Sequence, residues 1–322
     1  MNDPRPELRG LWLPLVTPFR DGALDEVSLR RLVRHYAGRP IDGLVLAATS
    51  GEGLTLSIAE HERLVTLVRG ELDDMCRPLC RPLRRPLRRQ MPLCLGLSGA
   101  ATCKLKNTLE ETADWPIDFY LIASPYYSRP SQRGLLQHFT ALADHASRPI
   151  VLYNIPYRTS VNLANDTLLA LAEHPNIVGL KDCGADRAQS IELLRSRPAG
   201  FRVLTGEDAQ YHDALTDGAD GAILLSAHIE TEMFAAVQTH LAAGDREAAA
   251  ACWQGVSELT ELLFAEPSPA PAKYWLARTG LIASAEVRLP MVEVSAELAR
   301  RLDREIAQRT NPSASSGLVN AG

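Results

Sequence analysis

The chain has 322 residues, of which 46% are hydrophobic and 23% charged, and its net charge is −5. This is the composition of an ordinary globular protein, and its acidic balance gives no reason to expect a nucleic-acid or membrane-surface partner. No apolar stretch of signal-peptide type or of membrane-spanning length is found, and the six cysteines include no C-x-x-C pair. We therefore expect a cytoplasmic protein with free thiols rather than disulfides or zinc ligands.

Eight short apolar runs follow one another along the chain and are predicted to be strands. They are residues 10–16, 41–48, 92–96, 117–123, 149–153, 177–181, 201–205 and 221–225. Helical spacing is found between them at residues 25–36, 57–72, 132–146, 165–173, 188–195 and 209–216. In the second of these helices, Ser57 and Glu60 form a capping-box pattern.

Strands that are apolar throughout and alternate with helices indicate a parallel sheet that is buried on both faces. Eight such units favour an α/β protein in which the sheet closes into a (β/α)8 TIM barrel. An open doubly wound sheet remains the alternative, although no G-x-G-x-x-G pattern follows the first strand to support it.

Other segments lie outside this repeat. We expect an N-terminal arm at 1–9, the barrel at 10–244, a C-terminal helical region at 245–309 and a disordered polar tail at 310–322. In the part that follows the eighth strand, helical structure is expected from residue 230 to 253 and beyond, with a break at Gly244, and helical patterns continue through 256–264, 272–279 and 295–308. Residues 76–90 form an Arg/Pro/Leu-rich insertion between a helix and a strand. Such a connection lies on the barrel face opposite the active site, so we assign the insertion no function.

Lys181 ends the sixth predicted strand. An amine at the mouth of an apolar interior is desolvated, which favours its neutral, nucleophilic form and suits it to form a Schiff base with a carbonyl substrate. The simpler interpretation is that the strand surfaces at Lys181 and leaves the amine in water, as for most lysines.

Polar side chains follow the other predicted strands, and in a barrel the C-terminal ends of the strands meet at the active site. These residues are Thr49 and Ser50, Tyr126 and Tyr127, Tyr153 and Arg158, and the segments 206–208 and 223–226. Singly they have ordinary explanations, since Tyr153 can fill a core layer and Arg158 can lie in solvent. Their convergence on Lys181 favours a lysine-centred active site.

Five of these segments also carry a family resemblance. In chain order they are Thr-Ser-Gly-Glu at 49–52, Pro-Tyr-Tyr at 125–127, Tyr-Asn-Ile-Pro at 153–156, Gly-Leu-Lys at 179–181 and Thr-Gly-Glu-Asp at 205–208. Together they resemble the dihydrodipicolinate synthase/N-acetylneuraminate lyase family of pyruvate-dependent class I aldolases, from Gly10 to about Gln308. The complete Tyr-Asn-x-Pro-x-Arg-Thr motif at 153–159 is similar to the synthase branch. This implies condensation of pyruvate with L-aspartate 4-semialdehyde to 4-hydroxy-tetrahydrodipicolinate, in lysine and diaminopimelate biosynthesis.

The resemblance implies a catalytic role for four residues. Lys181 would hold pyruvate as an imine, and Tyr153 would donate and accept protons beside it. Thr49 would link Tyr153 to Tyr127, which in this family comes from the neighbouring subunit. The resemblance therefore implies a homo-oligomer of at least two subunits, and the usual state of the family is a tetramer built as a dimer of dimers.

The resemblance implies substrate binding by four further residues. Arg158 would grip the carboxylate of the aldehyde acid through paired hydrogen bonds. Ser50, together with the backbone near Gly206 and Ile223, would hold the pyruvate carboxylate and shape the pocket. Because the imine acts as the electron sink, no metal or organic cofactor is expected.

Two departures from the family pattern bear on function. Ser50 stands where relatives commonly have a second threonine, and its hydroxyl is retained. Ala100 and Lys104 stand where lysine-inhibited synthases carry Asn and Glu, so we expect free lysine to inhibit weakly or not at all. Two other functions stay open: a related aldolase or lyase acting on a 2-keto-3-deoxy acid or a sialic-acid-like substrate, and a catalytically idle barrel that uses the insertion for binding.

Overall fold

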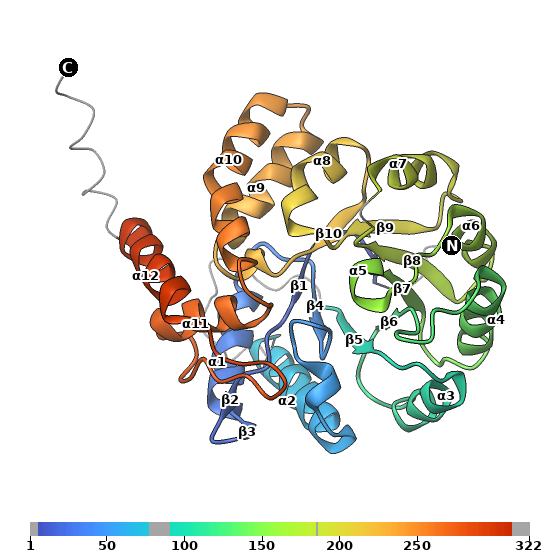
Figure 1. The fold of residues 1–322 in the computed structure, drawn as a ribbon, viewed down its shortest axis with the longest axis horizontal. Helices are drawn as coiled ribbons and strands as arrows, with labels where there is room; N and C mark the ends of the chain where they lie inside the picture. Colours follow the sequence, from blue (N-terminus) through green and yellow to red (C-terminus); the bar gives the residue numbers. More distant parts are fainter. Residues whose placement is uncertain (1–5, 77–90, 185, 311–322) are drawn as a thin grey trace.

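The structure is a computed structural model that describes residues 6–76, 91–184 and 186–310. Within these ranges, eight parallel strands close into a barrel that is surrounded by helices (Figure 1). The strands are β1 (Gly10–Pro14), β4 (Gly43–Leu46), β5 (Leu93–Leu97), β6 (Phe119–Ala123), β7 (Ile150–Asn154), β8 (Ile177–Asp182), β9 (Arg202–Thr205) and β10 (Gly221–Ile223). Each lies within or overlaps a predicted strand, so the (β/α)8 barrel is confirmed and the open sheet is excluded.

Two apolar layers hold the barrel together, because successive side chains of a strand point to opposite faces. On β6, Phe119 and Leu121 belong to the cluster inside the barrel, whereas Tyr120 and Ile122 belong to the cluster beneath the helices. Tyr153 belongs to the interior cluster. The alternation of side chains along each strand therefore decides which residues at its C-terminal end point into the barrel mouth and which point toward the helices.

The surrounding helices follow the predicted pattern with some differences. They are α1 (Glu26–Ala37), α2 (Ile58–Cys76), α3 (Thr102–Glu111), α4 (Gln132–Ala143), α6 (Asn165–Ala172), α7 (Arg187–Ser196), α8 (Tyr211–Thr216) and α9 (Thr231–Ala242). The predicted capping box begins α2: the Ser57 amide donates to Glu60 Oε2 at 2.9 Å, and the Glu60 amide donates to Ser57 Oγ at 3.3 Å. Helix α3 was not predicted, since only Leu105 and Leu109 of its ten residues are buried.

Two further elements near the barrel mouth were also not predicted. One is a small antiparallel hairpin of β2 (Phe19–Arg20) and β3 (Ala23–Leu24). The other is the single-turn helix α5 (Pro156–Thr159), which begins with a proline and carries Arg158. Both are too short to produce a periodic apolar pattern.

Three helices follow the barrel and gather on one side of it (Figure 1): α10 (Arg246–Leu263), α11 (Ala270–Arg278) and α12 (Ala296–Thr310). The predicted break at Gly244 is confirmed, and the helical pattern predicted to continue through 256–264 belongs to α10, which is one continuous helix. Gly255 lies inside α10, where a Cβ would come 3.1 Å from the Met233 side chain of α9. A glycine there permits close helix contact.

Parts of three predicted segments lie outside the described residues: the arm up to residue 5, the insertion from residue 77 to residue 90, and the tail from residue 311. Among the helices that the structure describes, none has the length and apolar character needed to cross a membrane.

Candidate active site

Lys181 lies near the C-terminal end of β8, and only 5% of its surface is exposed. It is paired in register with Tyr153 of β7 on one side and with Leu204 of β9 on the other. Its Nζ lies 4.4 Å from the centroid of the Tyr153 ring. The amine is therefore shielded from bulk water and held against an aromatic face, in contrast to the interpretation of Lys181 as a solvated side chain.

Tyr153 is as deeply buried as Lys181. Burial raises the pKa of its phenol well above the ordinary value, while a hydrogen bond with the Thr49 side chain and the charge of Arg158 act in the opposite direction. The Sγ of Cys183 donates to the Tyr153 hydroxyl at 4.0 Å, and burial raises the pKa of this thiol to about 12. Both groups are consequently protonated near neutral pH, so the phenol can donate a proton to a neighbouring group.

Gly206 lies directly against the lysine. A Cβ at this position would lie 2.3 Å from Lys181 Cε and 2.6 Å from Cys183 Sγ, so a side chain here would displace the lysine. The Gly206 amide donates to the Asp182 carbonyl at 2.7 Å. Ile223 of β10 is 2% exposed and belongs to the apolar cluster inside the barrel.

Asp208, two positions after Gly206, is a buried acid. Asp208 is 3% exposed, and its Oδ1 accepts a hydrogen bond from the Ser226 amide at 2.6 Å. Burial raises the pKa of this carboxyl to about 6, although the Ser226 hydrogen bonds and the charge of Lys181 oppose the shift. Asp208 thereby joins the loop after β9 to the turn after β10.

A cavity of about 590 Å³ opens at this end of the barrel. Thr49, Tyr153 and Arg158 all lie on its wall, and so does Tyr126. Ser50 is buried beside Thr49 in the loop after β4. The structure thus brings three of the eight predicted site residues onto one cavity wall, with Lys181 in contact with the Tyr153 ring.

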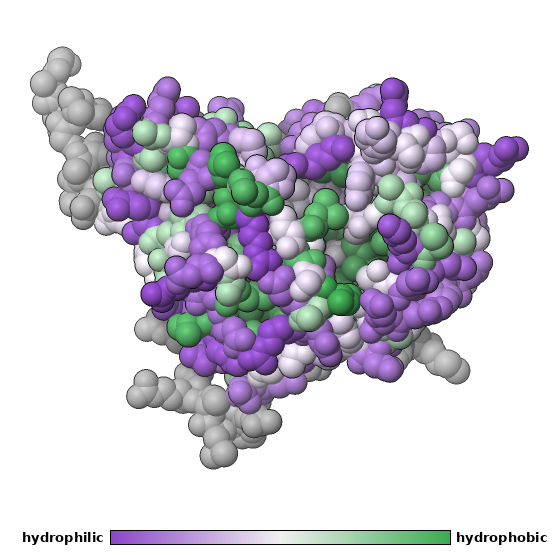
Figure 2. Space-filling view, turned by 60° about the horizontal axis from the view of Figure 1, so that its bottom comes forward, coloured by the Kyte–Doolittle hydropathy of each residue, from purple (hydrophilic) through white to green (hydrophobic). Residues whose placement is uncertain are grey.

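Tyr127 is placed differently from the other predicted residues. It is 93% exposed, and its backbone has a φ of 70°, in the left-handed region that is uncommon for a residue with a large side chain. It is not one of the residues that line the cavity within this chain. Apolar side chains gather around a hollow on the face of the molecule shown in Figure 2, and Leu54 and Ile58 on the cavity wall are 71% and 43% exposed.

A sequence model of the Dihydrodipicolinate synthetase family matches residues 7–77 and 90–309 of the chain. The chain belongs to this family. The match is interrupted where the Arg/Pro/Leu-rich insertion lies, which identifies those residues as an addition to the family pattern.

Individual members of the family are similar over nearly their whole length. A protein of Clostridium acetobutylicum named 4-hydroxy-tetrahydrodipicolinate synthase 2 is 40% identical, over 92% of this chain and 99% of its own. The solved 4-hydroxy-tetrahydrodipicolinate synthase of Methylacidiphilum fumariolicum is 31% identical, with a TM-score of 0.86 and coverage of 96% of this chain and 98% of its own. The chloride-inhibited dihydrodipicolinate synthase of Acinetobacter baumannii, solved in complex with pyruvate, is 30% identical, with a TM-score of 0.86 and coverage of 94% and 99%.

Sequence reasoning missed two features of this family member's site. One is the Cys183 thiol beside the Tyr153 hydroxyl. The other is a buried ion pair between Glu52 and Lys273, whose side chains are 2% and 0% exposed. Lys273 follows Ala270, Pro271 and Ala272 and precedes Tyr274 and Trp275. A lone cation in such an apolar stretch was the available signal for a buried lysine.

Within the described ranges, no group of three or more His, Cys, Asp or Glu side chains is arranged to hold a metal ion.

Proposed function

We propose that the chain condenses pyruvate with L-aspartate 4-semialdehyde to 4-hydroxy-tetrahydrodipicolinate, a lyase reaction of lysine and diaminopimelate biosynthesis that proceeds through a Schiff base on Lys181. The observation that carries the proposal is the buried Lys181 amine against the Tyr153 ring, beside a cavity lined by Thr49 and Arg158. The names of the relatives support the reaction, and the Acinetobacter baumannii enzyme, described as complexed with pyruvate, supports the first substrate.

The proposed chemistry begins with attack of the Lys181 amine on the ketone carbon of pyruvate, which loses water to give an imine. The imine withdraws electrons from the methyl group, so a methyl proton leaves and an enamine forms. The enamine carbon attacks the aldehyde carbon, and the aldehyde oxygen takes up a proton to become a hydroxyl group. The amine of the new chain then attacks the imine carbon and displaces Lys181, which closes the ring.

Each proton transfer needs a group beside the imine that can donate and accept. Tyr153 fits this role because its hydroxyl is buried and protonated, and because Thr49 lies with it on the cavity wall. Thr49 in turn would pass the proton toward Tyr127 of a second subunit. The aldehyde acid would be held at the cavity mouth by Arg158, whose Cζ lies 5.7 Å from the centroid of the Tyr157 ring.

The carboxylate of pyruvate would be held by Ser50 and by backbone groups near Gly206 and Ile223. The absence of a side chain at Gly206 supports this assignment, since it leaves backbone close to Lys181 accessible to a small anion. Because the lysine imine supplies the electron sink, the proposed reaction proceeds without a metal or organic cofactor.

We also propose that the chain works as a homo-oligomer, with a dimer as the active unit and a dimer of dimers as the complete assembly. The exposure of Tyr127 and the apolar residues Leu54 and Ile58 beside the cavity support a contact surface there. Mixing two inactive variants, Lys181→Ala and Tyr127→Phe, tests this arrangement. Activity should return in the mixture if Tyr127 acts across the interface, and no return would contradict it.

The remaining proposals concern location and domain division. The five cysteines that the structure describes are free thiols, which supports a cytoplasmic location. We propose residues 10–244 as the barrel and 245–309 as a C-terminal helical region.

Borohydride trapping tests the proposed function directly. Reduction in the presence of pyruvate should add one pyruvate-derived mass to the peptide that contains Lys181. Only four lysines occur in the sequence, namely Lys104, Lys106, Lys181 and Lys273, so peptide mapping identifies the modified residue without ambiguity. Mass on another lysine, or mass that persists in Lys181→Ala, would contradict the proposal. A panel of aspartate semialdehyde and 2-keto-3-deoxy acids then identifies the second substrate.

A further inference from the structure

The loop between β4 and α2 carries Thr49 and is wound unusually tightly. Ala47 and Glu52 both have left-handed backbone conformations, with φ of 54° and 53°. The Gly53 amide returns to the Ala48 carbonyl at 3.2 Å, and a Cβ at Gly53 would lie 1.8 Å from the Ala47 carbonyl oxygen. A left-handed conformation is costly for a residue with a side chain and persists only where the surroundings impose it.

The constraint on Glu52 comes from the C-terminal region of the chain. Lys273 of α11 donates from Nζ to Glu52 Oε1 at 2.7 Å, and the backbone amide of Arg288 donates to Glu52 Oε2 at 2.9 Å. The side chains of Glu52 and Lys273 are shielded from solvent almost completely. Both oxygens of one carboxylate are therefore held by groups more than 200 residues away in the sequence.

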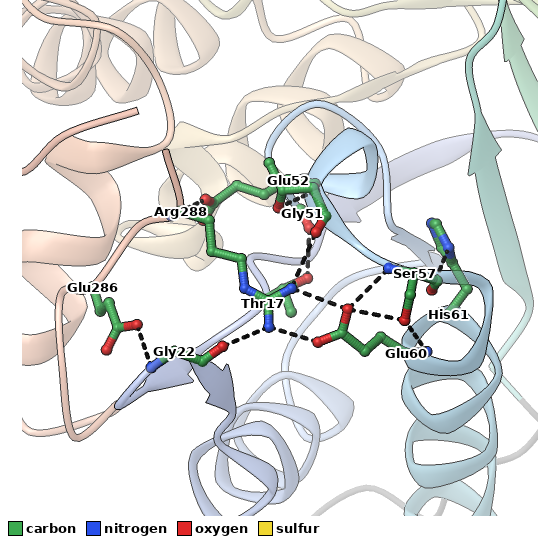
Figure 3. Close-up of polar contacts among 10 residues, drawn as sticks. Thr17, Gly22, Gly51, Glu52, Ser57, Glu60, His61, Glu286 and Arg288 are labelled. Carbon is green, nitrogen blue, oxygen red and sulfur yellow. Dashed lines mark hydrogen bonds and ion pairs between the residues drawn. The ribbon is translucent and has the colours of Figure 1, made fainter. Parts of the chain in front are cut away.

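The Arg288 side chain fixes its own segment to the same region (Figure 3). It donates to the Thr55 carbonyl at 3.1 Å and to Glu60 Oε2 at 3.0 Å, and these residues lie in the turn before α2 and in its first turn. Phe19 lies beside both cations, because Lys273 Nζ and Arg288 Cζ lie 4.3 Å and 4.2 Å from its ring centroid.

A short chain of contacts joins this cluster to the active site. The Glu52 amide donates to the Thr49 carbonyl at 3.1 Å, and Thr49 lies with Tyr153 on the cavity wall, where its side chain acts to lower the pKa of the Tyr153 phenol. Thr17 Oγ1 also holds the loop by donating to the Gly51 carbonyl at 2.7 Å. Pro269 and Met291, close in sequence to Lys273 and Arg288, lie on the wall of the same cavity.

We propose that Lys273 and Arg288 are positioning residues for the proton relay: acting through the Glu52 carboxylate, they hold the Thr49 hydroxyl in place for Tyr153. The C-terminal region is thereby part of the catalytic apparatus. This inference rests on the proposed function, because it assigns Thr49 and Tyr153 to proton transfer at a lysine-bound pyruvate. Removing the Lys273 charge leaves a buried carboxylate with one donor fewer, so Glu52 would rearrange and the loop would move with it.

The test uses exchange of the pyruvate methyl protons for deuterium in D2O, followed by NMR and normalised to the number of sites that borohydride traps with pyruvate. This exchange needs Lys181 and the relay but no second substrate. In Lys273→Met we expect trapping to persist and exchange per trapped site to fall at least about tenfold, since a small displacement of a catalytic group has effects of this size or larger. When Lys273→Met is added to Thr49→Val, exchange per trapped site should differ by less than about twofold from that of Thr49→Val alone, because Lys273 acts through Thr49.

Arg69→Met is the matched control. Arg69 is also a buried cation with a carboxylate partner, Asp118, but it bonds the carbonyls of Pro116 and Met91 near the N-terminal ends of the strands. The Arg69→Met substitution should lower the melting temperature and leave exchange per trapped site within about twofold of the wild type. The positioning role is overturned if Lys273→Met also leaves exchange per trapped site within about twofold of the wild type. It is equally overturned if the fold-decrease in the double variant equals the product of the fold-decreases in Lys273→Met and Thr49→Val.

Arg288→Gln provides a second route if Lys273→Met does not fold. It retains the backbone amide that binds Glu52 but removes the contacts with Glu60 and the Thr55 carbonyl. We expect exchange per trapped site to fall at least about threefold, and a value equal to that of the wild type would overturn the inference. Failure of the proposed function is distinguished by the wild type itself: a wild-type protein that traps no pyruvate overturns the function, whereas unchanged exchange in the variants overturns the positioning role alone.

Discussion

Lys181 and Tyr153 occupy paired positions on adjacent parallel strands, and the lysine Nζ lies 4.4 Å from the centre of the tyrosine ring. Because the pairing fixes both Cα atoms, the ring covers the amine without depending on a flexible loop. The contact shields the amine from water on that side. The phenol and the amine are thereby held together beside the cavity that Tyr153 lines, an arrangement suited to the proposed proton transfer at an imine.

Replacing Tyr153 by Phe should retain this packing and remove only the proton donor. We expect kcat to fall about 100-fold or more, the usual size of a general acid–base contribution. Pyruvate trapping at Lys181 should persist at equilibrium, because imine formation does not destroy the amine site. The measurement is steady-state kinetics together with the mass of the reduced protein.

Tyr120→Phe is the control for this experiment. Tyr120 is equally buried, and its hydroxyl is hydrogen-bonded to Thr112 beneath the helices. Its loss should cost about 1 kcal/mol of unfolding free energy and leave kcat unchanged. A Tyr153→Phe variant with wild-type kcat would show that another group, such as the Cys183 thiol, carries the proton.

Replacing Arg158 by Gln should affect the second substrate. The guanidinium is positioned by the short helix α5 on the cavity wall, where it can pair with a carboxylate. We expect the KM for aspartate semialdehyde to rise about 10-fold to 100-fold while the KM for pyruvate changes little.

The surface residue Arg187 provides the comparison, since its ion pairs with Asp213 and Asp217 are solvent-exposed. Arg187→Gln should leave both KM values as they are. An equal rise in the two KM values of Arg158→Gln would indicate a general distortion of the cavity rather than loss of a carboxylate partner.

The sequence predicts those parts of the site that follow from strand order, and it does so for a physical reason. Each catalytic candidate that ends an apolar run, such as Lys181 or Tyr153, is placed by the closed parallel barrel. The Glu52–Lys273 pair could not be predicted in this way, because its partners are separated by 221 positions and meet only through the packing of α11 on the barrel mouth. Helix α3 was missed because two buried leucines in ten residues give little periodicity.

Asp208 predicts a specific dependence of stability on pH. Its pKa is about 6 in the folded protein against 3.8 for the ordinary carboxyl, so the native state holds the proton more tightly than the unfolded chain does. Its stabilising contribution is complete below the unfolded value and is lost as the pH rises through about 6. For a group that is 3% exposed, the loss is about 3 kcal/mol.

Asp208→Asn isolates this contribution, because the amide oxygen can still accept the Ser226 hydrogen bond without carrying charge. Thermal melting of both proteins, at about pH 4.5 and about pH 7.5, provides the measurement. The melting temperature of the variant minus that of the wild type should be larger at the higher pH than at the lower pH, because only the wild type loses the Asp208 contribution. A difference that does not vary with pH would mean that the Asp208 carboxyl titrates in its ordinary range.

Free lysine should inhibit this enzyme weakly or not at all. Ala100 lies in the segment that joins β5 to α3, and Lys104 lies in the first turn of α3; both are exposed and are close in sequence to Ser98 and Leu105 of the cavity wall. Alanine offers no side-chain hydrogen bond to an amino-acid effector, and the Lys104 ammonium repels that of lysine. Submillimolar lysine should therefore lower the rate little or not at all, measured at constant ionic strength with sodium chloride as the control. The double variant Ala100→Asn/Lys104→Glu should gain sensitivity, because it supplies an amide and reverses the charge. Half-maximal inhibition of the wild type in the submillimolar range would show that the effector is bound by other groups.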